Sequence, residues 1–424
     1  MKKILMLMVM MGLLTACGGG DEPTPPTPPT PARRTVVVYV AAENNLSPDS
    51  YTNLQDMITG RRQVADDENL VVFVDRANAT QLPFIVKVTK NESQPLDTLY
   101  KYTEDFYTSD PERFREVLQR IVGLCPATED YGLVLWGHAD GWIIESDAFN
   151  EQPTMGRRKA YGVDNGNNQA VLSGKWMNIP AMRQALEQLL PLKWKFIFCD
   201  CCNMQNAEVA YELREVADYI IASPAEITGI GAPYATIVKD LFIHDDVQMY
   251  TAVCTDYHAQ KTSYMGRGDE HLPISTVKTD KMEALATATR NILPAIADYV
   301  KTTDAMDGLI YYYSYEGKNS IDGRIMYDMN DVIRKALGSD SQAYQDWKAV
   351  FDEAVLSSMT SSLWHAQTVN FNAFTVTTDW NERQGVISMF FPLEQYNRLS
   401  KHHYNTDIKQ MQWYQAVDYQ AVGW

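Results

Sequence analysis

Short, fully apolar runs that end abruptly in polar residues constrain the fold of this chain more than any other feature. The clearest are residues 131–138, Tyr-Gly-Leu-Val-Leu-Trp-Gly-His, and residues 196–202, Phe-Ile-Phe-Cys-Asp-Cys-Cys. Such runs, rich in β-branched and aromatic residues, are typical of strands buried on both faces. Segments with helical spacing lie between them, and strands that alternate with helices predict a parallel sheet covered on both faces. We therefore expect an α/β fold.

The pattern predicts an ordered series of elements along the chain. Asp110 and Pro111 form a helix-start signature, with a side-chain cap followed by proline in the first turn. Beyond about residue 240 the pattern changes to longer helical stretches, which would supply core mass and leave room for extra strands. Strands are expected at 35–41, 70–75, 84–88, near 133, up to 202, 219–222 and 385–391, and helices at 49–58, 110–122, from 178, 204–216, 281–302 and 329–337.

Two of the apolar runs deliver a reactive side chain at their ends, His138 and Cys202. Open α/β sheets carry their ligand sites at the carboxyl ends of the strands, so we expect both side chains at one edge. A thiolate attacks a peptide carbonyl, and an imidazole can protonate the departing amine. We expect a helix to start near Met204, so that its N–H groups lower the pKa of the Cys202 thiol and stabilise an oxyanion.

The motifs around these two residues resemble those of the clostripain family of cysteine peptidases, relatives of caspases, legumain and gingipains. Residues 136–142, Trp-Gly-His-Ala-Asp-Gly-Trp, are similar to the family's W-x-H-G-x-G-W, and residues 199–204 are similar to its F-D-A-C-L-M. Further similarity lies at 38–46, 208–213, 222–226, 231–234 and 385–392. The resemblance implies a caspase-like α/β/α sandwich with a mostly parallel central sheet. It also implies a cysteine endopeptidase that works through an acyl-enzyme.

The resemblance carries roles onto individual residues. It makes Cys202 the nucleophile, with Cys201 in place of the motif alanine, and His138 its partner in a Cys-His dyad. The backbone of Ala139 and Cys202 would support the oxyanion. Asp200 would line the pocket for the residue before the scissile bond, which implies cleavage after Arg or Lys. Asp200 could instead hydrogen-bond nearby backbone, as aspartates often do.

Departures from the family pattern leave a second interpretation open, namely a catalytically silent surface lipoprotein that binds peptides or glycans. Ala139 replaces the glycine after the histidine and would be strained if that position needs a positive φ. Asn203 replaces an apolar residue beside the nucleophile. Pro224 and Ala225 replace the family's residues in the stretch near the substrate pocket. This departure affects the expected substrate specificity more than the expected class of enzyme.

A basic triplet, Arg157-Arg158-Lys159, lies in a polar stretch between the two motifs. Such triplets are common on solvated loops, which is the simpler interpretation. The alternative is a self-cleavage site, since an enzyme that cuts after Arg or Lys could process itself there and relatives are cut in a similar place. That interpretation predicts an inactive or slow precursor.

The first residues have the pattern of a secretion signal. Lys2 and Lys3 precede an apolar stretch shorter than the about 20 residues that a membrane span needs. Residues 14–17, Leu-Thr-Ala-Cys, resemble the lipobox of bacterial lipoproteins, which implies lipidation of Cys17. The Pro/Thr/Gly-rich stretch 18–33 is expected to be a tether, 34–240 the catalytic domain, and 241–424 a region that packs on it and extends it. The protein is then exported and lipid-anchored to a bacterial membrane, on the outer membrane facing the periplasm or the surface.

Composition and charge bear on partners and cofactors. The hydrophobic content of 45% is ample for a core, and a net charge of −17 argues against nucleic acid as a partner. We expect a monomer that acts on peptides or proteins.

Cysteines 199, 201 and 202 are too close together for a zinc site, whose ligands come from separate elements, so no metal is expected there. Calcium is left open, because acids such as Asp164 could bind it although no ligand loop of defined spacing is present.

Overall fold

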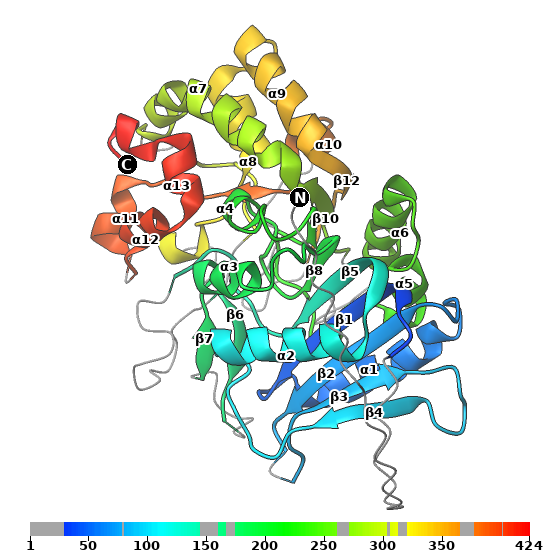
Figure 1. Cartoon of the computed structure of the whole chain (residues 1–424). Coiled ribbons are helices and arrows are strands. Elements are labelled where there is room, and N and C mark those ends of the chain that lie inside the picture. Colours follow the sequence, from blue (N-terminus) through cyan, green and yellow to red (C-terminus); the bar gives the residue numbers. More distant parts are fainter. Residues whose placement is uncertain are drawn as a thin grey trace, which may run out of the picture.

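The computed structural model describes residues 29–78, 80–144, 160–166, 174–260, 271–302, 306–312, 320–364, 377–400 and 402–424. The main sheet is built from β1 (Ala32–Ala42), β2 (Asn69–Arg76), β3 (Phe84–Val88), β4 (Leu96–Lys101), β5 (Ala127–Trp136), β8 (Phe196–Asp200), β9 (Tyr219–Ala222), β10 (Ile274–Lys278) and β12 (Val355–Met359). These nine strands lie in the order β12-β10-β9-β8-β5-β1-β2-β3-β4 (Figure 1). The middle strands, from β9 to β2, are parallel, and antiparallel strands flank them at both ends. The predicted α/β fold with a mostly parallel centre is confirmed.

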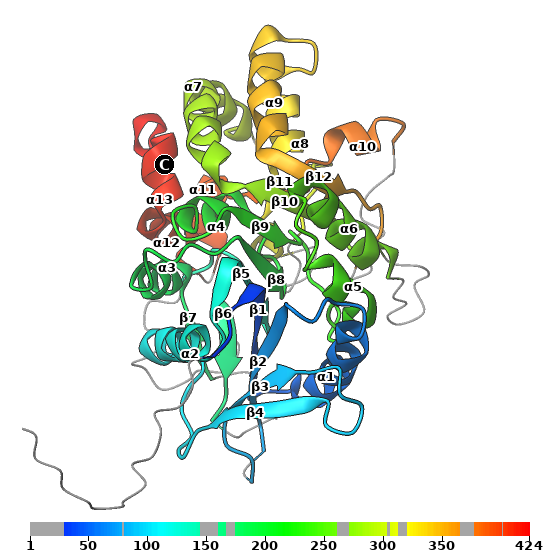
Figure 2. The same cartoon turned by 45° about the vertical axis from the view of Figure 1, so that its right-hand side comes forward.

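Helices cover both faces of the sheet (Figure 2). One face carries α1 (Ser47–Arg61), α5 (Tyr234–Asp240) and α6 (Asp246–Ala259). The other carries α2 (Pro111–Leu124), α3 (Ile179–Glu187) and α4 (Ala207–Glu212), and the later helices α7 (Met282–Val300), α8 (Met329–Leu337), α9 (Gln342–Ala354) and α13 (Gln412–Val417) extend that layer. The result is the three-layered sandwich that the resemblance implied.

The strand β1 shows how the sequence produces two cores. Val36, Val38 and Val40 belong to the cluster under α1, α5 and α6. Val37 and Tyr39 belong to the cluster on the opposite face. Successive side chains of a strand point to opposite faces, so a strand buried on both sides must be apolar throughout.

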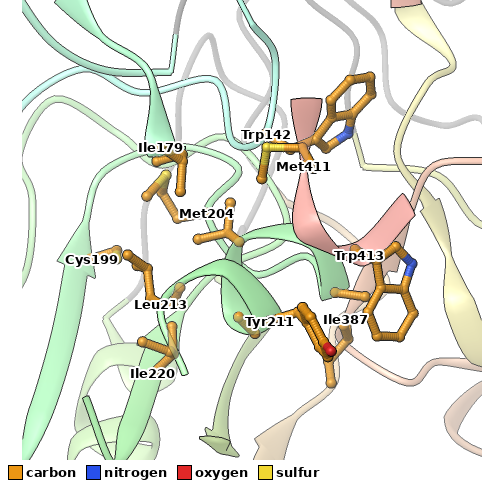
Figure 3. Close-up of a cluster of buried hydrophobic side chains, with 14 of the residues drawn as sticks. Trp142, Ile179, Cys199, Met204, Tyr211, Leu213, Ile220, Ile387, Met411 and Trp413 are labelled. Carbon is orange, nitrogen blue, oxygen red and sulfur yellow. The ribbon is translucent and has the colours of Figure 1, made fainter. Parts of the chain in front are cut away.

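Strands from beyond residue 240 belong to the same sheet. β10 pairs with β9, and β12 pairs with β10, both in antiparallel orientation. The C-terminal helix α13 packs on α4, where the rings of Tyr211 and Trp413 lie 5.6 Å apart (Figure 3). The segment 241–424 therefore adds strands to the sheet and helices to both of its covering layers, α6 on one face and α7, α8, α9 and α13 on the other.

Element boundaries agree with the sequence where local signals are strong. The carboxylate of Asp110 accepts hydrogen bonds from the N–H groups of Glu112 and Arg113, so α2 starts as predicted. Two predictions were wrong. The helix expected over 204–216 is the short α4, because Asn206 caps it by accepting a hydrogen bond from Val209 N.

The second wrong prediction concerns the strand expected at 385–391. Only β13 (Ser388–Met389) forms there, paired with β11 (Tyr327–Asp328). Val386 has a φ of 56°, and Ser388 N donates to the carbonyl of Gln205, so the segment turns toward the end of the main sheet instead of extending. Within the described ranges, no helix is both long enough and apolar enough to cross a bilayer.

Candidate active site

The register of β5 and β8 brings the two motifs to one edge of the sheet. These strands are parallel neighbours, with Trp136 opposite Asp200. His138 and Cys202 each follow two residues later, so they occupy equivalent positions beyond the two strand ends. Neighbouring strands lie about 4.8 Å apart, which gives the scale of the separation between the two backbones here.

The loops that carry His138 and Cys202 are in backbone contact. Gly141 has a φ of +65°, and a Cβ at this position would lie 2.5 Å from the carbonyl oxygen of Asn203 and 2.5 Å from Nδ2 of Asn206. Only glycine fits this conformation in this space. The histidine loop is therefore packed directly against the turn that follows Cys202.

The imidazole of His138 is half-buried and is held by a residue from a third strand end. Its Nε2 lies 2.8 Å from Oδ1 of Asn45, which follows β1. An amide oxygen can only accept, so Nε2 carries the proton and Nδ1 is the basic nitrogen. Burial lowers the pKa of His138 to about 4, which keeps the ring neutral at physiological pH. Asn45 was not among the site residues predicted from the sequence, although it lies in the family-like stretch 38–46.

The backbone beside His138 is fixed by β6 (Tyr161–Asp164), which pairs with β7 (Lys175–Met177). Gly162 N donates to the carbonyl of His138 at 2.8 Å, and Asp140 N donates to the carbonyl of Ala160 at 3.0 Å. In this antiparallel arrangement the N–H of Ala139 faces away from β6. Ala139 does not have a positive φ, so alanine causes no backbone strain at this position.

Cys202 is partly exposed, whereas Cys125, Cys199, Cys201 and Cys254 are buried, and all five are free thiols. Its Sγ accepts a hydrogen bond from Ile227 N at 3.4 Å. Cys201 is fully buried in the cluster on the opposite face, as the alternation of strand side chains requires. Cys202 is thus the accessible thiol among the described cysteines.

The expectation that a helix start lowers the pKa of the Cys202 thiol is wrong. α4 begins only at Ala207, and Asn203, with a φ of 57°, opens a turn between the thiol and that helix. Asparagine tolerates this left-handed conformation better than the family's apolar residue would. Burial raises the pKa of the thiol, and the negative charges of Glu226 and Asp140 add to the effect. The pair is therefore a thiol and a neutral imidazole.

Alkylation of Cys202 should report this raised pKa directly. The rate with iodoacetamide should climb steadily from about pH 6 to pH 10, roughly tenfold per unit, because only the thiolate reacts. Mass spectrometry of the modified peptide gives the rate, with Cys202→Ala as the control for other sites. A plateau reached below pH 8 would show instead that the thiolate is already stabilised.

Asp200 lies at the end of β8 with both carboxylate oxygens engaged. Oδ2 accepts hydrogen bonds from Ala232 N at 3.0 Å and Tyr234 Oη at 2.7 Å, and Oδ1 accepts one from Tyr257 Oη at 2.6 Å. The residue is 2% exposed, and burial raises its pKa. Gly231 approaches so closely that a Cβ there would lie 2.9 Å from Oδ2. These contacts match the alternative in which Asp200 bonds nearby groups, and its place in a substrate pocket stays a prediction.

The remaining predicted site residues, Cys17 and the triplet Arg157, Arg158 and Lys159, lie outside the described residues.

A model of the clostripain family matches residues 38–424. The chain belongs to the clostripain family. No curated protein sequence matches this clostripain-family chain. The match covers the strand ends that carry His138 and Cys202.

Solved structures place this clostripain-family chain among cysteine proteases. A secreted C11 cysteine protease from Bacteroides thetaiotaomicron, solved with an irreversible peptide inhibitor, is 25% identical, with a TM-score of 0.70 over 92% of this chain and 100% of that one. An inactive zymogen C11 protease from Parabacteroides distasonis is also 25% identical, with a TM-score of 0.67 over 92% of this chain and 99% of that one.

Proposed function

We propose that this protein is a cysteine endopeptidase that cleaves peptide bonds after arginine or lysine through Cys202 and His138. The observation that carries the proposal is the convergence of the two motifs. The β5–β8 register and the contact of Gly141 with Asn203 bring a partly exposed thiol and an imidazole to the same sheet edge.

The proposed reaction starts from the neutral pair. As Sγ of Cys202 attacks the carbonyl carbon of the peptide, the thiol proton passes to Nδ1 of His138. The N–H groups of Ala139 and Cys202 are the candidates to stabilise the oxyanion. His138 then gives its proton to the departing amine, and water, deprotonated by the same ring, releases the acyl group from sulfur.

The charges around the thiol support a preference for basic substrates. Glu226, Asp140 and Asp200 all lie close enough to Cys202 for their negative charge to act on its pKa. A cationic side chain next to the scissile bond would be attracted to this site, and a neutral or acidic one would not.

A panel of fluorogenic peptides that differ only in the residue before the cleaved bond tests the function. We expect kcat/KM for arginine and lysine to exceed that for glutamine, leucine or glutamate by about 100-fold or more. A buried carboxylate in the substrate pocket, the role predicted for Asp200, discriminates strongly against a substrate side chain that lacks a positive charge. Equal cleavage after leucine or glutamine would refute the specificity, and no hydrolysis of any peptide would refute the activity.

We also propose that the protein is made as a precursor and cuts itself at Arg157–Lys159. Lys159 is followed directly by Ala160, whose carbonyl accepts a hydrogen bond from Asp140 in the histidine loop. A cut just before Ala160 would create a new chain end directly beside that loop. The similarity to an inactive zymogen C11 protease is consistent with such a precursor.

Replacing Arg157, Arg158 and Lys159 together with glutamine should leave an uncut chain that hydrolyses peptides at least about tenfold more slowly. Gel electrophoresis gives the cleavage, and the fluorogenic assay gives the rate. Arg398→Gln, on the exposed surface of α11 (Glu394–Leu399), is the matched control and should be cut normally. Full activity in the uncut triple variant would end this proposal.

A further inference from the structure

An open cavity of about 400 Å³ lies beside the active-site edge of the sheet, and the proposed reaction does not use it. Its described lining consists of His258 and His271, the hydroxyl side chains of residues 360–362 and 377–378, Trp380 and Asn381. None of these lining residues carries a carboxylate, although the chain as a whole has a net charge of −17. The cavity is therefore a place in this acidic protein where the described lining does not repel an anion.

The strand pairing places the cavity at the same edge as the proposed nucleophile. β9 runs parallel to β8, and β10 and β12 continue the sheet beyond it (Figure 2). The first residue of β10, Ile274, pairs with the last residue of β12, Met359, and the end of β9 lies beside the start of β10. The segments before β10 and after β12, which line the cavity, therefore leave the sheet at the edge where Cys202 follows β8.

The end of α6 connects the cavity with Asp200, the residue predicted to line the substrate pocket. Tyr257 donates to Oδ1 of Asp200 at 2.6 Å, and the next residue, His258, lines the cavity. Two strand spacings separate β8 from β10, and three separate β8 from β12. With about 4.8 Å for each spacing, the cavity lies on the order of 10–14 Å from the strand end that carries Cys202.

The order of His138 and Cys202 along the edge determines which part of a substrate reaches the cavity. His138 has to give its proton to the departing amine, so the chain after the cleaved bond lies on the β5 side of Cys202. The residues before the cleaved bond lie on the other side, toward β9, β10 and β12. An extended peptide advances about 3.3 Å per residue, so its third or fourth residue before the bond lies at the cavity.

His258 and His271 form a stacked pair, with ring centroids 5.1 Å apart and 28° between the ring planes. Nδ1 of His258 lies 2.8 Å from the carbonyl oxygen of Leu272, and Nδ1 of His271 lies 2.9 Å from that of His258. A carbonyl oxygen only accepts, so both Nδ1 atoms carry a proton and both Nε2 atoms are left for a ligand. A ring that takes up a second proton at Nε2 is a cationic donor, which is a strong partner for a carboxylate.

We propose that this cavity binds an acidic side chain, glutamate or aspartate, at the third or fourth residue before the cleaved bond, an inference that rests on the proposed function and deepens it. Asn381 accepts from Thr360 Oγ1 at 3.0 Å through its amide oxygen, which leaves its NH₂ group to donate. Trp380 Nε1 donates to the carbonyl of Ser361 at 3.1 Å and so holds the hydroxyl-rich wall in place. The acids around Cys202 are farther from the cavity than the Debye length of about 8 Å, so salt screens their repulsion.

Fluorogenic peptides with arginine before the cleaved bond and glutamate, glutamine or lysine at the third or fourth position before it test the site. We expect kcat/KM for glutamate at one of these positions to exceed that for glutamine about tenfold, mainly through a lower KM, because the charge-assisted hydrogen bonds are lost with the amide. The expected ratio of glutamate to lysine is larger still.

His258→Asn combined with His271→Asn keeps a donor close to each Nδ1 position and removes Nε2, so the ratio of glutamate to glutamine should fall to near one. His403→Asn, at an exposed histidine before α12 (Tyr404–Asp407), is the matched control and should keep the ratio. Ser362→Asp, at an exposed position of the lining, covers the case in which the double variant does not fold. Its new carboxylate should reverse the preference, so that lysine exceeds glutamate.

Binding of the same peptides, fluorescently labelled, to the Cys202→Ala chain gives the preference by fluorescence anisotropy without hydrolysis. A peptidase that fails in the assay and a cavity that fails to select are therefore distinguishable, because the binding measurement decides the second question alone. Equal affinity for the glutamate and glutamine peptides would refute the site. A glutamate preference that survives unchanged in both the double variant and Ser362→Asp would place its recognition elsewhere and overturn the proposal.

Discussion

Replacing Cys202 with alanine is expected to lower kcat/KM for an arginyl or lysyl peptide by about 10⁴-fold or more, with the fold retained. The thiol is the accessible one among the described cysteines, and it lies at the strand end next to that of His138. The other described cysteines, Cys201 beside it included, are buried and should not take over the covalent step. Steady-state hydrolysis of the best fluorogenic peptide, together with the circular dichroism spectrum of the variant, provides the measurement.

Cys201→Ala is the matched control, since it removes the adjacent sulfur from the opposite face of the strand. It is fully buried, so the change should cost about 1 kcal/mol of stability and leave kcat/KM within a few-fold of the wild type. Covalent labelling by an arginyl or lysyl chloromethyl ketone should persist in Cys201→Ala and disappear in Cys202→Ala. Labelling that persists in Cys202→Ala and disappears in Cys201→Ala would show that Cys201 is the nucleophile. A wild-type protein that is not labelled at all would favour the catalytically silent lipoprotein that binds peptides or glycans.

Gly141→Ala is expected to lower kcat/KM by about 100-fold and to reduce Tm as well. The new Cβ would overlap the carbonyl oxygen of Asn203 and Nδ2 of Asn206, and alanine at a φ of +65° adds about 1–2 kcal/mol of backbone strain. Relief of the overlap requires the histidine loop to move away from the Cys202 turn. Catalysis depends on the distance between the sulfur of Cys202 and the imidazole of His138. The loss in kcat/KM should therefore be larger than the loss of stability alone would explain.

Gly123→Ala gives a matched glycine substitution away from the site. Gly123 lies inside α2, where a Cβ would meet nothing within 4 Å. Alanine should stabilise that helix by roughly 0.5–1 kcal/mol and leave hydrolysis unchanged. Wild-type activity in Gly141→Ala would show that the contact between the two loops is not needed for catalysis.

Much of the candidate site could be located from the sequence, because its chemistry begins where apolar strands end. His138 and Cys202 were found in this way, and the register of β5 and β8 places them at one edge. Asn45 was missed, since its hydrogen bond to His138 spans 93 residues and exists only because β1 lies beside β5. The raised pKa of Cys202 was also missed, since it depends on burial and on acids from distant loops.

The sequence by itself determined the apolar strands, their alternation with helices and the capped start of α2, because strand patterns and helix caps act over a few neighbouring residues. Only the tertiary structure decided that β10 and β12 complete the sheet and that His258 and His271 stack beside its active-site edge. Strand order, register and the burial of charge arise from packing between segments far apart in the chain. No local pattern encodes such packing, so the histidine pair became visible only once the strands were in place.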